Sequence, residues 1–303
     1  MVGVDRRKPK PNIPSDQKTL TFLQTSKYEK PLMKIKIDPI APPFTWAGGK
    51  RWLIQNYPKL IPDFSGKYIE PFAGGAAVFF HLSPRSALLA DTNRDLINAY
   101  EALRNCWEEV LKTLIVHDRR HSDEYYYSVR ASRPRTPANR AARFIYLNRT
   151  CFNGLYRVNQ KGQFNVPKGT KDSVLRTTDD FARVSCILRN TELVVSDFES
   201  VIDAANSSDL VFVDPPYTVA HRFNGFVKYN EILFSWDDQL RLAACLRRAS
   251  ARKVKVISTN ADHQSLYRLY QGDFKVQRLA RNSLISASSN NRKPITELLI
   301  TSG

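Results

Sequence analysis

Short apolar runs alternate with longer segments of helical periodicity along most of the chain. The runs have the length and the flanking residues of β-strands, and the segments between them are long enough for helices. This alternation predicts an α/β fold built on a doubly wound, Rossmann-like sheet. The strand-like runs cover residues 68–70, 87–90, 192–195, 210–213, 254–258, 274–277 and 297–300.

The alternation is interrupted between residues 105 and 185, where helix-like segments and one hairpin candidate replace the strands. The helix-like segments cover residues 107–116, 137–150 and 179–188. We therefore predict a mainly helical domain, carrying a β-hairpin, that is inserted into the sheet domain. The predicted division is a flexible basic arm at 1–40, the sheet domain at 41–104 and 186–303, and the inserted domain at 105–185.

Positive charge is concentrated in the inserted segment. The chain has a formal net charge of +17, and residues 118–176 hold 13 Lys and Arg against 4 Asp and Glu, which is +9 in this stretch alone. A basic run can also be a solvated surface, but here aromatic residues are interleaved with the charges. Such a mixture is typical of nucleic-acid binding. The aromatic residues are Tyr125, Tyr126, Tyr127, Tyr146, Phe152 and Tyr156.

The cysteines indicate a reducing compartment. Cys106, Cys151, Cys186 and Cys245 lie far apart and form no Cys-x-x-Cys pair, and the scattered histidines add no metal site. Free thiols of this kind are typical of the cytosol. No apolar stretch approaches the roughly eighteen residues of a membrane helix, and residues 1–40 lack the apolar core of a signal peptide. We expect a cytoplasmic protein with no membrane association and no metal.

The tetrapeptide Asp214-Pro215-Pro216-Tyr217 directly follows the apolar run at 210–213. The amino nitrogen of a planar base is a poor nucleophile, because its lone pair is delocalised into the ring until acceptors localise it. Asp214 and the Pro215 carbonyl can accept its two hydrogen bonds, and the prolines, having no N–H, fix the turn. Tyr217 offers a flat surface on which an extruded base can stack. The tetrapeptide alone is also compatible with an ordinary Asp-Pro turn.

Residues 67–75 are predicted as a strand followed by a tight glycine turn, which comes before a helix-compatible segment at 76–82. Glycines at such a turn allow the backbone to approach a ligand closely. No Lys-Ser/Thr pair follows them, which argues against a phosphate-binding P-loop. Asp91 ends the second strand, about twenty residues further on, where an acidic residue can bind ribose hydroxyls. With the tetrapeptide downstream, these features predict an S-adenosylmethionine pocket beside an amino-group site.

From residue 44 to the C-terminus, the chain resembles the Dam family of DNA adenine N6-methyltransferases. The order of glycine motif, recognition region and DPPY tetrapeptide is that of the alpha group within this class. Besides the tetrapeptide, the resemblance is carried by residues 44–50, by 69–75, by 90–98, by the DNA-reading hairpin at 146–149, 152–157 and 162–167, and by 288–293.

The resemblance implies which residues bind the cofactor and which act on the base. The catalytic set is Asp214, Pro215, Pro216 and Tyr217. The residues implied in S-adenosylmethionine binding are Trp46, Lys50, Glu70, Pro71, Phe72, Gly74, Asp91 and Asp214. Without the resemblance, Trp46 would be interpreted as a core residue, Lys50 as a surface lysine and Asp91 as a helix cap.

The resemblance also implies a DNA-reading set on the hairpin, where Asn153 and Gly154 are a turn-prone pair. Arg157 would donate two hydrogen bonds to O6 and N7 of a guanine. Leu155 and Pro167 would contact a thymine methyl group, and Phe152 would fill the gap left by a flipped base. Ordinary packing within the hairpin remains the alternative for Leu155 and Phe152. The implied DNA-binding residues are Phe152, Asn153, Leu155, Arg157 and Pro167.

The activity implied is methyl transfer from S-adenosylmethionine to N6 of a flipped adenine in a short site in double-stranded DNA. Two alternatives stay open: an RNA or protein-amide methyltransferase of the (D/N)PPY class, and a catalytically inactive DNA-binding regulator. Thr45 stands where GATC-specific members carry a basic residue, so another short palindrome is an equal expectation. The chain has no nuclease motif, so a coupled restriction endonuclease would be a separate protein. The sequence leaves the oligomeric state open.

Overall fold

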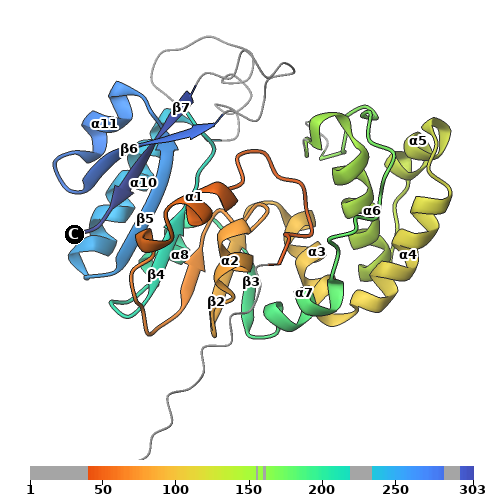
Figure 1. Ribbon diagram of the computed structural model, residues 1–303, viewed down its shortest axis with the longest axis horizontal. Coiled ribbons are helices and arrows are strands. Elements are labelled where there is room, and N and C mark those ends of the chain that lie inside the picture. Colours follow the sequence, from red (N-terminus) through yellow and green to blue (C-terminus); the bar gives the residue numbers. More distant parts are fainter. Residues whose placement is uncertain (1–39, 155, 160–161, 219–233, 283–293) are drawn as a thin grey trace, which may run out of the picture. The chain divides into compact units, whose positions relative to one another are not determined.

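In the described part of the chain, seven strands form one sheet in the order β3-β2-β1-β4-β5-β7-β6 (Figure 1). Strand β7 runs antiparallel to both of its neighbours, β5 and β6, and the other pairs are parallel. Five of the seven strand-like runs lie within these strands, and the runs at 254–258 and 274–277 each begin one residue before their strand. The predicted doubly wound α/β sheet is confirmed. The strands are β1 (Tyr68–Glu70), β2 (Ala87–Asp91), β3 (Thr191–Val195), β4 (Leu210–Val213), β5 (Lys255–Ala261), β6 (Lys275–Asn282) and β7 (Pro294–Thr301).

The computed structural model describes residues 40–303 except 155, 160–161, 219–233 and 283–293. Three elements of the sequence analysis therefore lie outside the described residues. They are all but the last residue of the predicted basic arm at 1–40, Leu155 of the hairpin, and the block at 288–293.

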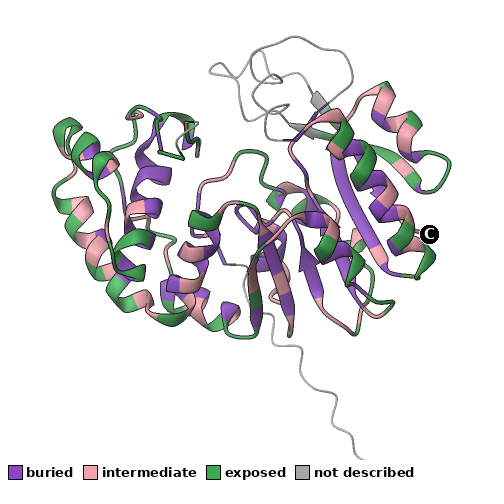
Figure 2. Ribbon diagram, turned by 180° about the vertical axis from the view of Figure 1, so that it is seen from behind, coloured by how far each residue is buried: buried purple, intermediate pink, exposed green. Residues whose placement is uncertain are grey.

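Helices cover both faces of the sheet, which explains why its central strands are continuous apolar runs. All four residues of β4 are buried, and the central strands are buried along their length in Figure 2. Ile69, Val211 and Val213 pack with α8 (Phe198–Asp203), α10 (Trp236–Ala251) and α11 (Gln264–Tyr270). The alternate positions, including Tyr68 and Phe212, pack with α1 (Arg51–Asn56), α2 (Ala77–Leu82), α3 (Arg94–Asn105) and α7 (Phe181–Leu188). A short 3-10 helix, η1 (Pro58–Leu60), follows α1.

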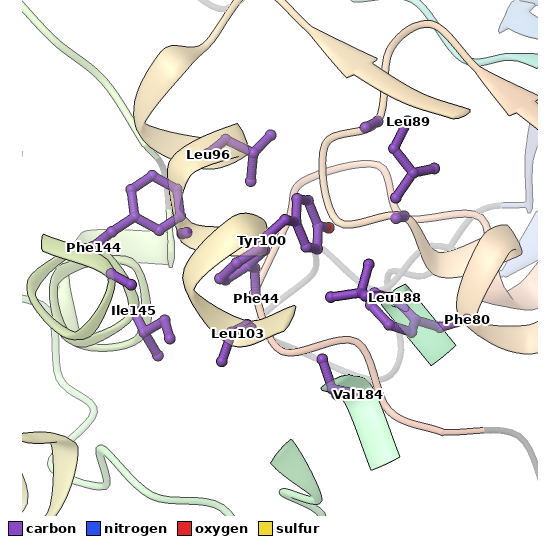
Figure 3. Close-up of a cluster of buried hydrophobic side chains, with 14 of the residues drawn as sticks. Phe44, Phe80, Leu89, Leu96, Tyr100, Leu103, Phe144, Ile145, Val184 and Leu188 are labelled. Carbon is purple, nitrogen blue, oxygen red and sulfur yellow. The ribbon is translucent and has the colours of Figure 1, made fainter. Parts of the chain in front are cut away.

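The segment between α3 and α7 contains three helices, α4 (Trp107–Arg119), α5 (Asp123–Ala131) and α6 (Pro137–Thr150). The bounds of α6 match the predicted helix, whereas α5 was not predicted. Figure 3 shows Phe44 between Tyr100 of α3 and Phe144 of α6, and its ring centre lies 4.7 Å from that of Tyr100 and 5.2 Å from that of Phe144. The helical segment therefore shares one apolar core with the sheet. The boundaries of an inserted domain at 105 and 185 remain a prediction.

The hairpin begins directly after α6, and its tip differs from the predicted one. Isolated bridges pair Cys151 with Lys168 and Val158 with Phe164. Beyond these bridges, the Asn159 N–H donates to the Gln163 carbonyl and the Gly162 N–H donates to the Asn159 carbonyl, both at 2.8 Å, and Gly162 has a φ of 68°. The turn-prone residues at 153–154 instead lie in η2 (Phe152–Gly154), which follows the helix. The block at 146–149, expected as part of the hairpin, is the buried last turn of α6.

All four cysteines are free thiols, and two of them, Cys151 and Cys245, are buried. Within the described ranges, no helix is long and apolar enough to span a membrane. No cluster of three His, Cys, Asp or Glu suited to a metal ion occurs in the same ranges.

Candidate active site

The two motifs that the sequence singled out meet at the centre of the sheet. Strands β1 and β4 are parallel neighbours, and the chain winds from β1 towards β2 and β3 but from β4 towards β5. Ligands of open α/β sheets bind at such a switch point, outside the carboxyl ends of the strands. The glycine turn follows β1 directly, and Asp214 follows β4 directly. The topology therefore places the predicted cofactor turn and the predicted catalytic aspartate side by side.

The glycine turn is the surface on which Trp46 packs. Gly74 has a φ of 45°, and a Cβ at this position would lie 2.6 Å from Nε1 of Trp46. A Cβ on Gly75 would lie 2.9 Å from Cβ of the same tryptophan. The turn is also fixed from the other side, because the Tyr100 hydroxyl donates to the Gly74 carbonyl at 2.8 Å. Any larger residue at position 74 would displace Trp46.

Asp91 is held against the same turn. Its Oδ2 accepts a hydrogen bond from the Gly74 N–H at 3.1 Å, and its Oδ1 accepts one from the Asn93 N–H at 2.9 Å. Burial raises the pKa of the Asp91 carboxyl. The N-cap of α3 is Asn93, whose side chain accepts from the N–H groups of Asp95 and Leu96. The helix-cap interpretation of Asp91 is therefore wrong, and its carboxylate lies beside the turn.

Lys50 is buried beside the predicted catalytic tetrapeptide. Its side chain is only 3% exposed, and its Nζ lies 2.9 Å from Oδ1 of Asp214. Thr259 of β5 donates a hydrogen bond to the same oxygen at 2.7 Å. The surface interpretation of Lys50 is wrong, and the loop at 44–50 joins the two motifs: Trp46 contacts the glycine turn and Lys50 contacts Asp214.

A second carboxylate, Glu297 of β7, completes this buried group. The Tyr217 hydroxyl donates to its Oε2 at 2.9 Å, and Nζ of Lys50 lies 3.7 Å from the same oxygen. The Lys50 ammonium also lies 4.9 Å from the centre of the Tyr217 ring, within range of a cation–π interaction. The sequence analysis missed Glu297 and Thr259. Glu297 could have been found, because it is an acidic residue inside an apolar strand and such residues are rarely buried unless paired.

The remaining cofactor candidates lie beneath the turn. Glu70 is 3% exposed and accepts a hydrogen bond from the Tyr68 hydroxyl at 3.1 Å. Burial, reinforced by the charge of Asp214, raises the pKa of Glu70 well above its usual range. Pro71 is buried, and Phe72 stacks on Phe198 with ring centres 5.3 Å apart. A role for these three in cofactor binding stays a prediction.

Four of the five predicted DNA-reading residues are exposed to solvent on the hairpin, and the fifth, Leu155, lies outside the described residues. Phe152 is 51% exposed, so packing within the hairpin does not account for it. Asn153, Arg157 and Pro167 are also exposed. The Arg157 Nε donates to Oδ1 of Asn165 on the opposite arm at 3.1 Å, which orients the guanidinium. The described residues bring none of this set into contact with the buried group around Asp214.

Tyr156 attaches the hairpin to the rest of the protein. Its ring lies 4.8 Å from that of Phe144 and 5.3 Å from that of Phe164. Its hydroxyl donates to Oδ2 of Asp95 on α3 at 2.6 Å. The hairpin is therefore anchored on α3 and α6 through this side chain, while Arg157 next to it points to solvent.

Asn148 and Arg149 join α6 to the loop that carries Trp46 and Lys50. The Asn148 amide accepts from the N–H of Thr45 and donates to its carbonyl, both at 2.7 Å. Arg149, which is 2% exposed, donates to the Pro43 carbonyl at 2.7 Å and forms an ion pair with Asp179 at 2.6 Å. Both residues face the protein interior, and their contacts hold the loop against α6.

Fold and site together define a methyltransferase in which a glycine turn and a DPPY tetrapeptide share one edge of the sheet. The family of D12 class N6 adenine-specific DNA methyltransferases matches residues 46–284 of the chain. The chain belongs to this family, and is thus an adenine-specific DNA methyltransferase. Membership implies S-adenosylmethionine as the methyl donor.

Individual relatives are similar over nearly their whole length. The chain is 36% identical over 269 residues to the Type II methyltransferase M1.LlaDCHI of Lactococcus lactis subsp. cremoris, covering 86% of this chain and 94% of the relative. It is 33% identical over 285 residues to the Type II methyltransferase M.MjaIII of Methanocaldococcus jannaschii, covering 86% and 98%. It is 29% identical over 264 residues to a DNA adenine methylase of Haemophilus influenzae, covering 85% and 92%.

Proposed function

We propose that this protein transfers a methyl group from S-adenosylmethionine to N6 of an adenine within a short, specific site in double-stranded DNA. The observation that carries the proposal is the position of Asp214 at the carboxyl end of β4, beside the glycine turn of β1. An acceptor for an amino group and a turn suited to a nucleoside are thereby adjacent at the switch point of the sheet.

The residues at the turn fit S-adenosylmethionine. Asp91 has its carboxylate at the tip of β2, where it can accept hydrogen bonds from the ribose hydroxyls. Trp46, partly exposed over the glycines, offers an apolar surface for the bound cofactor. When bound, the cofactor supplies a methyl group on a positively charged sulfur.

The tetrapeptide accounts for the activation of N6. Both contacts that the described residues make with the Asp214 carboxylate end on Oδ1, which leaves Oδ2 to accept one N6 hydrogen. The Pro215 carbonyl accepts the other, and Pro216 keeps the turn rigid. The adenine leaves the duplex and stacks on the Tyr217 ring. N6 then forms its bond to the methyl carbon as the carbon–sulfur bond breaks, and the extra proton on N6 passes to water.

Lys50 and Glu297 orient this machinery. Lys50 and Thr259 fix one oxygen of Asp214, so that the carboxylate is not free to rotate when the base arrives. Glu297 fixes the Tyr217 hydroxyl and thereby the plane of its ring. Since a neutral nucleophile attacks a cation, the site mainly needs such orientation and a fixed negative charge at N6.

Both alternative functions are disfavoured, each by a different observation. Membership in a DNA adenine methyltransferase family disfavours an RNA or protein-amide substrate. Retention of Asp214, Tyr217 and the glycine turn in one site disfavours an inactive regulator. Two relatives are named Type II methyltransferases, which favours a restriction–modification setting with a separate endonuclease.

Single-molecule sequencing of DNA from cells that lack adenine methylation and express the chain tests the proposal. We expect modified adenines at one short sequence, and none in cells that express Asp214→Ala. Unmodified DNA from cells that contain the folded protein would refute it.

Arg157→Ala is expected to relax recognition at one guanine rather than weaken all sites equally. Arg157 is exposed on the hairpin and oriented by Asn165, and a two-bond guanine contact is worth about 1–3 kcal/mol of discrimination. The kcat/KM on near-cognate duplexes should therefore rise relative to that on the cognate duplex by roughly ten- to a hundredfold. The measurement is kcat/KM on duplexes with single substitutions. Unchanged ratios across all of them would remove Arg157 from the reading set.

A further inference from the structure

A pocket of about 360 Å³ lies beside Trp46 and is lined by three segments of the chain, within residues 41–51, 75–77 and 171–178. Its lining contains three cationic side chains, those of Arg51, Lys171 and Arg176. None of its described lining residues is acidic. The pocket uses no residue of the hairpin between 151 and 168, and it does not include Asp91, Lys50 or Asp214.

Arg176 is held in a fixed orientation in this pocket. It is half-buried, and its Nη2 donates to the Thr45 hydroxyl. Thr45 is itself anchored, because Asn148 binds both its N–H and its carbonyl at 2.7 Å. The orientation of the guanidinium is therefore fixed by two successive contacts, that of Asn148 with Thr45 and that of Thr45 with Arg176.

The charge of Arg176 is not neutralised within the described residues. No carboxylate there lies within 4.0 Å of its guanidinium, and the nearby Asp179 is occupied by Arg149, to which it is bound at 2.6 and 2.8 Å. Burial, together with the charge of Arg149, lowers the pKa of Arg176 to about 10. The side chain stays charged at neutral pH, although its surroundings disfavour the charge. An anion or a pair of acceptor oxygens would relieve this cost.

We propose that this pocket is a second DNA contact, separate from the hairpin, in which Arg176 and Lys171 bind acceptor atoms of the duplex. The proposal rests on the proposed function, since it takes double-stranded DNA as the substrate. The planar fork of a guanidinium matches two acceptors at once, as presented by a phosphate or by O6 and N7 of a guanine. Lys171, which is exposed on the same pocket, adds a second donor. Thr45 contributes the hydroxyl that positions the guanidinium.

The experiment compares Arg176→Ala with Arg189→Ala in the full chain. Arg189 is a matched control because it is exposed and caps α7 just before β3 begins, at the sheet edge opposite the site. Binding to the cognate duplex and to single-substituted duplexes is measured over a range of salt concentrations. The KM for S-adenosylmethionine and the thermal midpoint of each variant are measured alongside.

Arg176→Ala should weaken duplex binding by about tenfold and reduce the salt slope by about one unit, with the control unchanged. A loss that is equal on all duplexes identifies the ligand as a phosphate, and a loss of discrimination at one base pair identifies it as a guanine. Thr45→Val, which keeps every charge but removes the positioning hydroxyl, should weaken binding by a smaller factor and leave the salt slope intact. This second variant keeps the test decisive should Arg176→Ala fold poorly.

Two results would overturn the proposal. One is duplex binding by Arg176→Ala that equals that of Arg189→Ala. The other is a raised KM for S-adenosylmethionine with normal DNA binding, which would make the pocket part of the cofactor site. Because DNA binding is measured apart from turnover, a wild-type protein that binds DNA without methylating adenine would refute the proposed function and not this contact.

Discussion

Asp214→Ala is expected to reduce methyl transfer by roughly a thousandfold or more, while duplex affinity stays within a few fold of the wild type. In the proposed mechanism the carboxylate is the acceptor that localises the N6 lone pair, and it lies at the carboxyl end of β4. DNA affinity depends mainly on phosphate contacts elsewhere. Single-turnover rates and equilibrium binding, measured on the same preparation, separate the two effects.

Asp63→Ala is the control for this prediction, because Asp63 is an exposed aspartate outside the site. It should leave both the rate and the affinity unchanged. Parallel losses of turnover and DNA binding in Asp214→Ala, with a lowered thermal midpoint, would instead mark Asp214 as a structural aspartate.

Lys50→Met is expected to lower the free energy of unfolding by about 3 kcal/mol, the lower end of the range for a broken buried ion pair. The ammonium is buried and lies near two carboxylates, at 2.9 Å from Asp214 and 3.7 Å from Glu297. Asp214 is 20% exposed and can be partly solvated, so most of the cost falls on Glu297, which is 2% exposed. Denaturant unfolding of the purified variant gives the value.

The double variant Lys50→Met/Glu297→Gln provides the matched test of this explanation. Glutamine keeps an acceptor for the Tyr217 hydroxyl but removes the carboxylate charge that faces Lys50. The double variant should therefore be more stable than the sum of the two single losses predicts. Additive losses would show that Lys50 and Glu297 do not stabilise each other.

The strands could be predicted from sequence because each is a short apolar run whose burial needs no knowledge of its partner. The position of β7 between β5 and β6 could not be predicted. The sequences of β6 and β7 contain nothing local that fixes which of them pairs with β5. The buried group around Asp214 depends on that order. Glu297 comes from β7 and Thr259 from β5, so their approach to Lys50 and Tyr217 follows only from the tertiary structure.

The burial of the aromatic residues in the basic segment could not be predicted from the sequence either. Tyr125 and Tyr126 counted towards a nucleic-acid surface, but both lie in the unpredicted helix α5. Tyr126 is fully buried and donates to the Val166 carbonyl at 3.0 Å, and Tyr125 contacts His117 at 2.9 Å. Only Tyr127 of the three is strongly exposed, at 44%. A run of adjacent tyrosines has no apolar periodicity, so its helix and its buried face could not be recognised.

Product analysis shows whether N6 of adenine in duplex DNA is the methyl acceptor. Purified protein is incubated with duplex DNA and S-adenosylmethionine carrying an isotopically labelled methyl group. The DNA is then digested to nucleosides and analysed by mass spectrometry. Labelled N6-methyldeoxyadenosine should form with the wild type and be absent with Asp214→Ala. Label in N4-methyldeoxycytidine, or in no DNA nucleoside at all, would contradict N6 of adenine as the acceptor.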